Sequence, residues 1–221
     1  TTIDLENQSN TKQGSDAAIM SLIKDMNAGN VDALLINGVD PVFTMGDAFK
    51  KALAKVKTTV CFATKMNDTA ADCNYVAATN HQLEAWNDAE PVKGFLSLGQ
   101  PTISPLFDTR QMEDCLLKWS GSDSSYSDYI KTNWEATIFP KSGALMFTDF
   151  WNKTLHDGVL DLPVVASEET LTFTGDVNKA ASAIAKVETG SMEIELNQNM
   201  AVGAGSGADN PWLQEMPDPL T

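Results

Sequence analysis

Two short polar segments, each following a run of apolar residues, contain the side chains best placed for chemistry. The first holds Gly38, Asp40 and Pro41 after residues 31–36 (VDALLI), and the second holds Asp68 and Thr69 after residues 58–63 (TTVCFA). Gly38 permits close approach of the backbone, Asp40 can accept hydrogen bonds, and Pro41 stiffens the turn. Open α/β sheets bind ligands at the carboxyl ends of their strands. We therefore predict that both segments lie side by side at one sheet edge and form a cleft.

Histidine and cysteine, the residue types most often found in catalytic and metal sites, are rare in this chain. His81 and His156 are the only histidines, and Cys61, Cys73 and Cys115 are the only cysteines. Without a C-x-x-C or H-x-x-x-H pair, the chain by itself is not expected to hold an iron–sulfur cluster or another metal. We expect no catalytic residue. The cysteines are predicted to be small buried core thiols, and a single disulfide between two of them stays open.

The two histidines have different predicted settings. His156 lies near a predicted helix C-terminus, where the helix dipole favours an imidazolium. His81 is followed by Glu84, Asp88 and Glu90. Those carboxylates form either an acidic pocket or part of a solvated loop or interface, and the sequence favours the second interpretation.

The elements that must position the two polar segments follow from apolar spacing. A helix is expected from Ser15 or Asp16 to Gly29, with residues 31–36 as a strand buried on both faces. Phe49, together with Ala52, Leu53 and Val56, marks a second helix face, and residues 58–63 form a second strand. A β-loop-α-β unit of this length makes a parallel crossover. This part is therefore predicted to be α/β, Rossmann-like, with a parallel sheet.

The rest of the chain is less regular. A helical turn at 68–72 and an extended piece at 75–79 precede an extended loop with an edge strand at 94–105. Further helices are expected around 112–119, 126–134, 145–155 and 176–187, and a half-exposed strand at 192–196. The predicted organisation is a polar N-terminal segment (1–14), an α/β domain (15–190) with a helical insertion at about 119–158, and a β strand with a C-terminal tail (191–221).

Composition restricts the binding partners. The chain has 221 residues, 43% of them hydrophobic, and its 15 basic and 30 acidic residues give a net charge of -15. That charge repels nucleic-acid phosphates and anionic lipid, so neither is an expected partner. No apolar run approaches the length of a membrane-spanning helix, so direct membrane insertion is not expected.

The order of several segments resembles the molybdopterin oxidoreductase family of the dimethyl-sulfoxide-reductase type. Residues 31–41 (VDALLINGVDP) are similar to its strand ending in G-x-N-P, and residues 66–76 (MNDTAADCNYV) to its following loop. A narrower resemblance covers most of residues 16–118 and the tail. Residues 83–91 (LEAWNDAEP), 100–110 (QPTISPLFDTR) and 210–219 (NPWLQEMPDP) look like the large iron–sulfur subunit of bacterial alternative complex III.

This resemblance implies a segment of a longer subunit on the periplasmic side of the inner membrane. The family's subunit has a molybdopterin-enzyme-like half without the cofactor and a cysteine-rich half that carries iron–sulfur clusters. The chain would then be a non-catalytic segment of the first half, with no cofactor of its own. It would support electron transfer carried by clusters elsewhere and dock other subunits of a quinol-oxidising respiratory complex.

The resemblance also identifies Gly38, Asp40, Asp68 and Thr69 with the family's cofactor-binding cleft. Asp40 replaces the family's Asn, and no Lys or Arg lies between Asn30 and Phe49. An anionic dinucleotide needs compensating donors or cations. We therefore expect a cleft that is empty or filled by protein. One alternative is a fragment of a polysulfide-reductase-like catalytic subunit that binds molybdopterin guanine dinucleotide, and another is a free-standing α/β binding module.

Overall fold

The structure is a computed structural model that describes residues 7–11, 14–163, 174–183, 192, 194, 200–203, 207, 208 and 210–217. Contacts divide the chain into two units, Thr1–Val164 and Val165–Thr221. The division predicted at 190/191 lies outside the described residues and stays a prediction. Each unit is described by itself.

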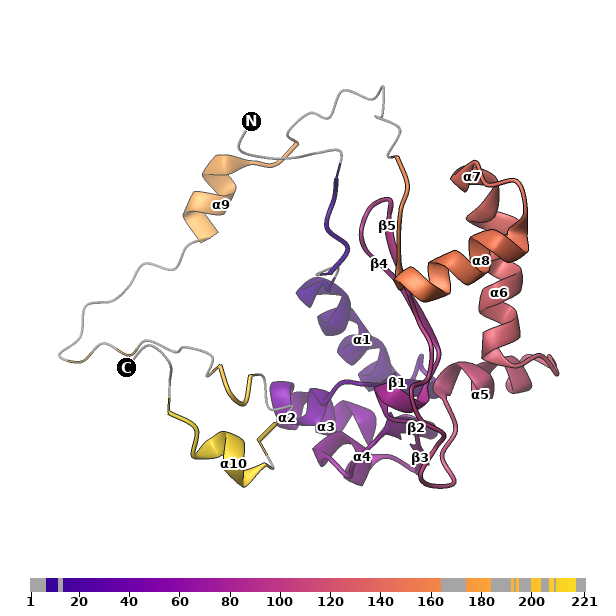
Figure 1. The fold of residues 1–221 in the computed structure, drawn as a ribbon. Coiled ribbons are helices and arrows are strands. Elements are labelled where there is room, and N and C mark those ends of the chain that lie inside the picture. Colours follow the sequence, from indigo (N-terminus) through magenta and orange to yellow (C-terminus); the bar gives the residue numbers. More distant parts are fainter. Residues whose placement is uncertain are drawn as a thin grey trace. The chain divides into compact units, whose positions relative to one another are not determined.

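The first unit opens with a mixed α/β region built on a parallel sheet (Figure 1). Its elements are α1 (Asp16–Ala28), β1 (Ala33–Asn37), α2 (Pro41–Met45), α3 (Asp47–Leu53), β2 (Thr58–Ala63), α4 (Asp68–Asp72) and β3 (Tyr75–Ala78). The sheet order is β1-β2-β3, and both pairings are parallel. The predicted parallel crossover between the first two strands is confirmed.

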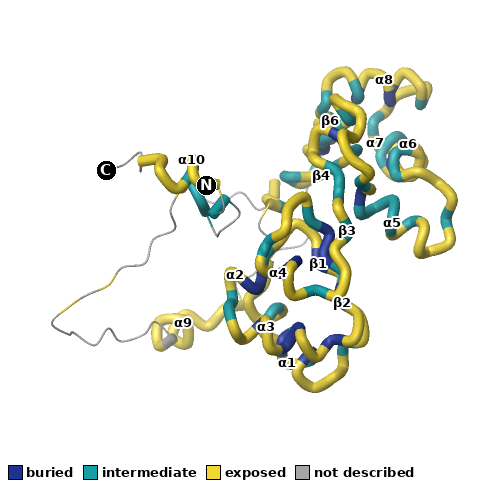
Figure 2. Tube along the Cα trace, turned by 90° about the horizontal axis from the view of Figure 1, so that it is seen from below, coloured by how far each residue is buried: buried dark blue, intermediate teal, exposed yellow. Residues whose placement is uncertain are grey.

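Local signals define the first helix. Ser15 accepts a hydrogen bond from the N–H of Ala18, and Gly29 ends the helix in the left-handed region at φ +77°. Ile23 and Met26 are buried in a core with Phe49, Leu53 and residues of the sheet. Figure 2 shows this buried interior against an exposed outer surface. The helix predicted from Ser15 or Asp16 to Gly29 is confirmed.

The first strand differs from its prediction in extent and burial. β1 begins at Ala33, not Val31, and Leu35 is 45% exposed although Ile36 is buried. The predicted burial on both faces is wrong because β1 is an edge strand, and the core with α1 and α3 forms on one face of the sheet. The other face is covered in part where the Phe62 ring contacts Trp119, with ring centroids 5.9 Å apart.

A second sheet follows in the same unit. After the 3-10 turn η1 (Gln82–Glu84), the antiparallel strands β4 (Asn87–Val92), β5 (Phe95–Gly99) and β6 (Val159–Asp161) pair in that order. The expected edge strand within 94–105 is therefore wrong in position, since β5 is the central strand. Leu96 and Leu98 are buried on one face of it, which fixes its place.

Helices pack with this sheet around an aromatic core. They are α5 (Met112–Trp119), α6 (Tyr126–Thr137), α7 (Phe139–Ser142) and α8 (Phe147–Asp157). Trp134 is 1% exposed, and the rings of Phe150 and Trp151 lie 6.4 and 6.1 Å from it. These aromatic side chains pack against one another and form much of the core of this region.

The described part of the second unit contains α9 (Val177–Ala183) and α10 (Pro211–Gln214). Asn210 caps α10 by accepting from the N–H of Trp212. Most of the strand predicted at 192–196, and the end of the helix predicted at 176–187, lie outside the described residues. Among the residues that the structure describes, no helix combines the length and apolar character needed to cross a bilayer.

Candidate functional site

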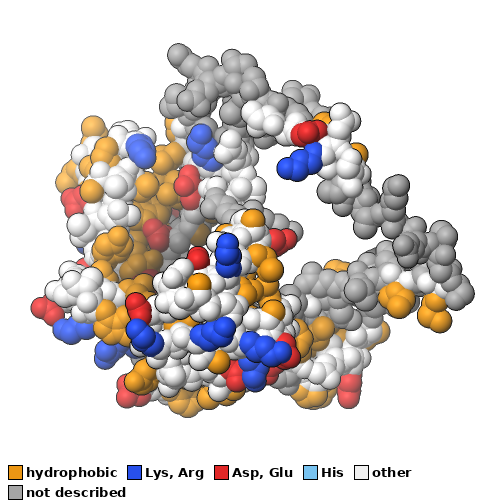
Figure 3. All heavy atoms as spheres, turned by 180° about the vertical axis from the view of Figure 1, so that it is seen from behind, with side chains coloured by type: hydrophobic (Ala, Val, Ile, Leu, Met, Phe, Trp, Pro, Cys, Tyr) orange, Lys and Arg blue, Asp and Glu red, His pale blue; other side chains and the backbone are white. Residues whose placement is uncertain are grey.

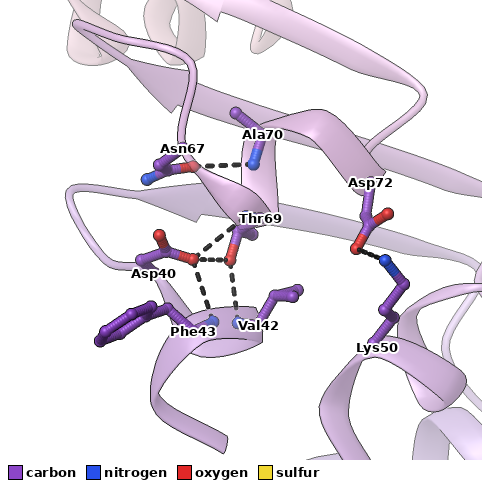
Figure 4. A network of polar contacts seen from close by, with 8 residues as sticks. All are labelled: Asp40, Val42, Phe43, Lys50, Asn67, Thr69, Ala70 and Asp72. Carbon is purple, nitrogen blue, oxygen red and sulfur yellow. Dashed lines mark hydrogen bonds and ion pairs between the residues drawn. The ribbon is translucent and has the colours of Figure 1, made fainter. Parts of the chain in front are cut away.

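The two polar segments predicted to share a sheet edge do meet there (Figure 4). Asp40 lies just after β1 and is the N-cap of α2, with Pro41 as the first helical residue. Thr69 lies in the first turn of α4, which follows β2. Because both strands run parallel, their following loops leave the sheet at the same edge. The predicted adjacency of these loops is confirmed.

One carboxylate oxygen joins the two loops. Thr69 donates to Asp40 Oδ1 from its hydroxyl, at 2.6 Å, and from its backbone N–H, at 3.1 Å. The N–H of Phe43 donates to the same oxygen at 3.3 Å. Thr69 Oγ1 in turn accepts from the N–H of Val42 at 3.0 Å. Asp40 Oδ1 therefore collects three donors from the first turns of two helices.

Thr69 is the buried partner of this pair, with none of its residue surface exposed. Its position is set by Asn67, whose side chain accepts from the N–H of Ala70 at 2.8 Å and so begins α4. An Asn at this place is a frequent helix N-cap. The sequence contains this signal, because Asn67 directly precedes the helical turn predicted at 68–72.

Gly38 allows the loop after β1 to adopt a left-handed backbone conformation. Its φ is +66°, in the region that side chains with a Cβ disfavour. A Cβ added there would meet no atom of the chain within 4 Å. The close approach expected at Gly38 is therefore absent within the described part of the chain, and the backbone angle explains the glycine.

Asp68 does not join the network. It is exposed in the first turn of α4. Lys50 forms an ion pair with Asp72 at 2.9 Å and so connects α3 with α4. The hydrogen bond and charge of Asp72 raise the pKa of Lys50, with a smaller effect from Asp68. Lys50 is thus already paired with a carboxylate of α4.

The carboxylates after His81 serve separate structural contacts. The buried Glu84 accepts from the N–H of His81 and of Leu106, both at 2.9 Å, and these bonds lower its pKa. Asp88 accepts from Trp134 Nε1 at 2.8 Å and from the Tyr126 hydroxyl at 3.3 Å. Burial, followed by the charge of Asp88, raises the pKa of Tyr126.

Glu90 accepts from the N–H of Gly94 at 2.7 Å, in the turn between β4 and β5. Glu84, Asp88 and Glu90 therefore each accept hydrogen bonds from different partners. The acidic-pocket interpretation is therefore wrong, because each carboxylate holds a different part of the fold.

The prediction of buried core thiols is confirmed for Cys61 only, because Cys73 and Cys115 are half-buried. Cys61, Cys73 and Cys115 are free thiols. Cys61 is 1% exposed, and burial, with a lesser effect of the neighbouring Cys73, raises its pKa to about 11. Among the described residues, no group of three or more His, Cys, Asp or Glu side chains is arranged to hold a metal ion.

His156 occupies the helix end that the sequence predicts, in the last turn of α8. Its side chain is exposed, and Nδ1 lies 3.0 Å from Oδ1 of Asp157. The same Asp157 pairs with Lys153 across one turn of the helix, and the hydrogen bonds of Lys153 and His156 lower its pKa. These contacts give His156 a role at the surface of the helix terminus.

Comparison with known proteins gives one partial similarity. No family model matches the chain. Over 111 residues it is 35% identical to the "Menaquinone reductase, molybdopterin-binding-like subunit" of Nitratidesulfovibrio vulgaris (strain Hildenborough). The alignment covers 45% of this chain but only 16% of that relative, so the chain matches a small part of its length. This similarity supports a relationship to molybdopterin oxidoreductase-like proteins.

Proposed function

We propose that this chain is a structural, non-catalytic segment of a molybdopterin-enzyme-like subunit in a quinone-linked respiratory complex. The proposed complex is of the alternative complex III type, on the periplasmic side of the membrane. In this complex, iron–sulfur clusters outside this segment, in the remainder of the subunit, carry the electrons. This segment docks neighbouring subunits. Its fold would be the sheet region of a molybdopterin oxidoreductase.

The similarity to a menaquinone reductase subunit supports the quinone-linked part of this proposal. That relative is described as molybdopterin-binding-like. The alignment covers 16% of its length and 45% of this chain. Activity, electron acceptor and partners of a whole complex therefore belong to the proposal.

The hydrogen bonding of Asp40 supports the structural role. The N–H groups of Thr69 and Phe43, and the Thr69 hydroxyl, all donate to this carboxylate. A bound pyrophosphate would need such donors, and the anionic Asp40 would repel it. The nearby Lys50 is already paired with Asp72. These residues do not fit an anionic pterin dinucleotide at this edge.

The alternative is a fragment of a catalytic subunit that binds molybdopterin guanine dinucleotide. The two proposals are distinguished by the molar ratio of pterin to this chain. The pterin released from the purified native complex and the amount of this chain in it are both measured. The structural proposal expects no pterin bound to the subunit that contains this chain. One pterin dinucleotide per chain would reject the proposal and support the alternative.

A variant separates structural support from catalysis. Thr69→Val removes the hydroxyl between Asp40 and Val42. We expect less assembled complex in the membrane, with unchanged quinol oxidation per mole of complex that does assemble. Thr69→Ser, which keeps the hydroxyl, is the matched control. A lower rate per assembled complex in Thr69→Val alone would place this site in the catalytic path.

A further inference from the structure

Two of the three cysteines lie against each other in the parallel-sheet region. Cys61 is in β2 and is buried, and Cys73 is the half-buried residue that ends α4. Cys73 packs against the hydrophobic core that contains Cys61, and a hydrogen bond joins their thiols. This thiol pair has no part in the hydrogen bonds of Asp40 described above.

The backbone around Cys73 is fixed to β2 and to α4. The next residue, Asn74, donates from its N–H to Thr59 Oγ1 at 2.8 Å, and its side chain accepts from the Thr59 N–H at 2.9 Å. The Cys73 N–H donates to the carbonyl of Ala70 at 3.3 Å. Thr59 lies two residues before Cys61, so both side chains point to the same face of the sheet. The contact between the two thiols is therefore set by the fold.

Cys115 has a different setting. It lies in α5, and the charged groups that act on its thiol are Arg110, Asp114 and Glu113, whereas neither of the other two thiols does. Like Cys73, it is half-buried. Cys115 is therefore a control thiol of similar exposure within the same chain.

We propose that Cys61 and Cys73 are a disulfide site, oxidised by exchange with an external disulfide. An S–S bond of about 2.0 Å forms from the hydrogen-bonded thiols by rotation of the two side chains about their Cα–Cβ bonds. Disulfides persist in oxidising compartments such as the bacterial periplasm, which is the location in the proposed function. The inference goes beyond that function, because the reaction requires an external disulfide and no other subunit.

The reaction consists of two thiol–disulfide exchanges. Cys73, the more exposed thiol, loses its proton and attacks one sulfur of the external disulfide, which releases one thiolate. Cys61 then loses its proton and attacks Cys73 Sγ in this mixed disulfide, which releases the second thiolate. Two cysteine thiols are oxidised, one external disulfide is reduced to two thiols, and the two cysteine protons end on the released thiolates.

Electrostatics determines which oxidant is a suitable probe. Burial and the charge of Asp72 raise the pKa of Cys73, and hydrogen bonds of Thr59 and Cys61 oppose this shift. Acidic side chains lie among the basic ones on the face drawn in Figure 3, and the whole chain has a net charge of -15. This charge repels an anionic disulfide such as oxidised glutathione. The neutral bis(2-hydroxyethyl) disulfide is therefore the probe.

The disulfide closes a loop that contains a residue of the candidate site. It ties the end of α4 to β2, while Thr69 in the first turn of α4 stays bonded to Asp40. A disulfide stabilises a fold mainly because it restricts the unfolded chain. We therefore expect oxidation to stabilise this region without a new contact to Asp40.

Peptide mapping of the full chain after oxidation tests this inference. The reduced chain is treated with bis(2-hydroxyethyl) disulfide at about pH 8.5, near the ordinary pKa of a thiol. It is then quenched with N-ethylmaleimide and digested with trypsin without reductant. Cleavage after Lys and Arg places Cys61, Cys73 and Cys115 in the separate peptides 58–65, 66–93 and 111–118. We expect the first two peptides to be joined, with the mass of two hydrogens lost, and the third to carry only a mixed disulfide.

Variants and unfolding provide the controls. Cys73→Ser should abolish the link, whereas Cys115→Ser should leave its yield unchanged. In urea, the ratio of linked to mixed-disulfide peptide should fall by about ten-fold or more, because the fold no longer gives the two thiols a high effective concentration. Oxidation should move the urea midpoint of unfolding upward in the natural chain and in Cys115→Ser, but not in Cys73→Ser. Dithiothreitol should reverse the shift.

Four results would overturn the inference: no link between Cys61 and Cys73, a link that includes Cys115, an equal ratio of linked to mixed-disulfide peptide in the folded and unfolded chains, or a urea midpoint that oxidation leaves unchanged. A link between Cys61 and Cys73 in a subunit that also holds pterin would uphold it. That result would reject the proposed function alone, so the two failures are distinguishable.

Discussion

Asp88 and Trp134 are joined by a 2.8 Å hydrogen bond from the indole Nε1 to the carboxylate, across 46 residues of sequence. The bond connects β4 with α6 beside the aromatic core. Because Trp134 is almost fully buried, its Nε1–H has no water to replace a lost acceptor. Asp88 is therefore a structural carboxylate.

Replacing Asp88 by Ala should destabilise the first unit by about 3 kcal/mol, since a buried donor loses a charged acceptor. Asp88→Asn, which keeps an oxygen acceptor, should cost less. The free energy of unfolding in urea, followed by tryptophan fluorescence, measures both. Asp161→Ala at an exposed position of β6 is the control and should change stability by about 0.5 kcal/mol or less. Equal losses for Asp88→Ala and Asp161→Ala would contradict this role.

Thr69 gives a second stability prediction. Thr69→Val keeps the size of the side chain but leaves the N–H of Val42 without its acceptor, so we expect a loss of about 2 kcal/mol. Thr69→Ser keeps the hydroxyl and should lose less. Chemical denaturation of the isolated chain provides both values. If Ser proves as destabilising as Val, the hydroxyl is not what joins the two loops.

Glu84 predicts a dependence of stability on acid pH. The N–H groups of Leu106 and His81 lower its pKa in the folded chain, relative to about 4.3 when unfolded. The stability that ionised Glu84 contributes is therefore present above its pKa in the unfolded chain. It is lost as the pH falls through its pKa in the folded chain. The gap in unfolding free energy between the natural chain and Glu84→Gln should be largest near pH 6 and shrink below about pH 4.3. A gap that stays constant over this range would show that ionisation of Glu84 is irrelevant.

Local signals in the sequence predict the part of the fold around the candidate site. Ser15 and Gly29 mark both ends of α1, and residues 58–63 match β2 in full. Once two strands are parallel, the meeting of Asp40 and Thr69 follows from topology. The hydrogen bond from the Thr69 hydroxyl to Asp40 could not be predicted, because it depends on the orientation of side chains in two short helices.

Non-local pairing explains what the sequence does not reveal. β4 has the sequence NDAEPV, in which the polar residues and Pro91 argue against a strand. The structure accommodates the proline beside a register shift between Ala89 and Val92. The third strand of that sheet, β6, begins at Val159, after four intervening helices. Neither segment contains a local sequence pattern that predicts the pairing of β6 with β5.

The buried thiols give a prediction for chemical modification. Cys61 is buried and has a pKa of about 11, so little thiolate forms near neutral pH. We expect alkylation of Cys61 to be slow in the folded chain and fast after unfolding, whereas the partly exposed Cys115 reacts earlier. Mass spectrometry of peptides after timed alkylation measures both rates. Equal rates for Cys61 and Cys115 in the folded chain would show that Cys61 is accessible.

Gly38 and Gly14 allow a test of backbone conformation at the candidate site. Neither has an atom of the chain within 4 Å of an added Cβ, but Gly38 has a φ of +66° and Gly14 has no such positive angle. Gly38→Ala should therefore cost about 1–2 kcal/mol through the left-handed conformation alone. Gly14→Ala should be neutral or slightly stabilising, since alanine restricts the unfolded chain.

The same pair tests whether this conformation positions Asp40. Strain at Gly38 acts two residues before the carboxylate that accepts from Thr69. We expect amide hydrogen exchange at Thr69 and Phe43, whose N–H groups donate to Asp40, to become faster in Gly38→Ala and to stay unchanged in Gly14→Ala. Faster exchange spread evenly over the first unit would mean that only global stability has changed. Unchanged exchange at both amides would show that Asp40 keeps its place without the glycine.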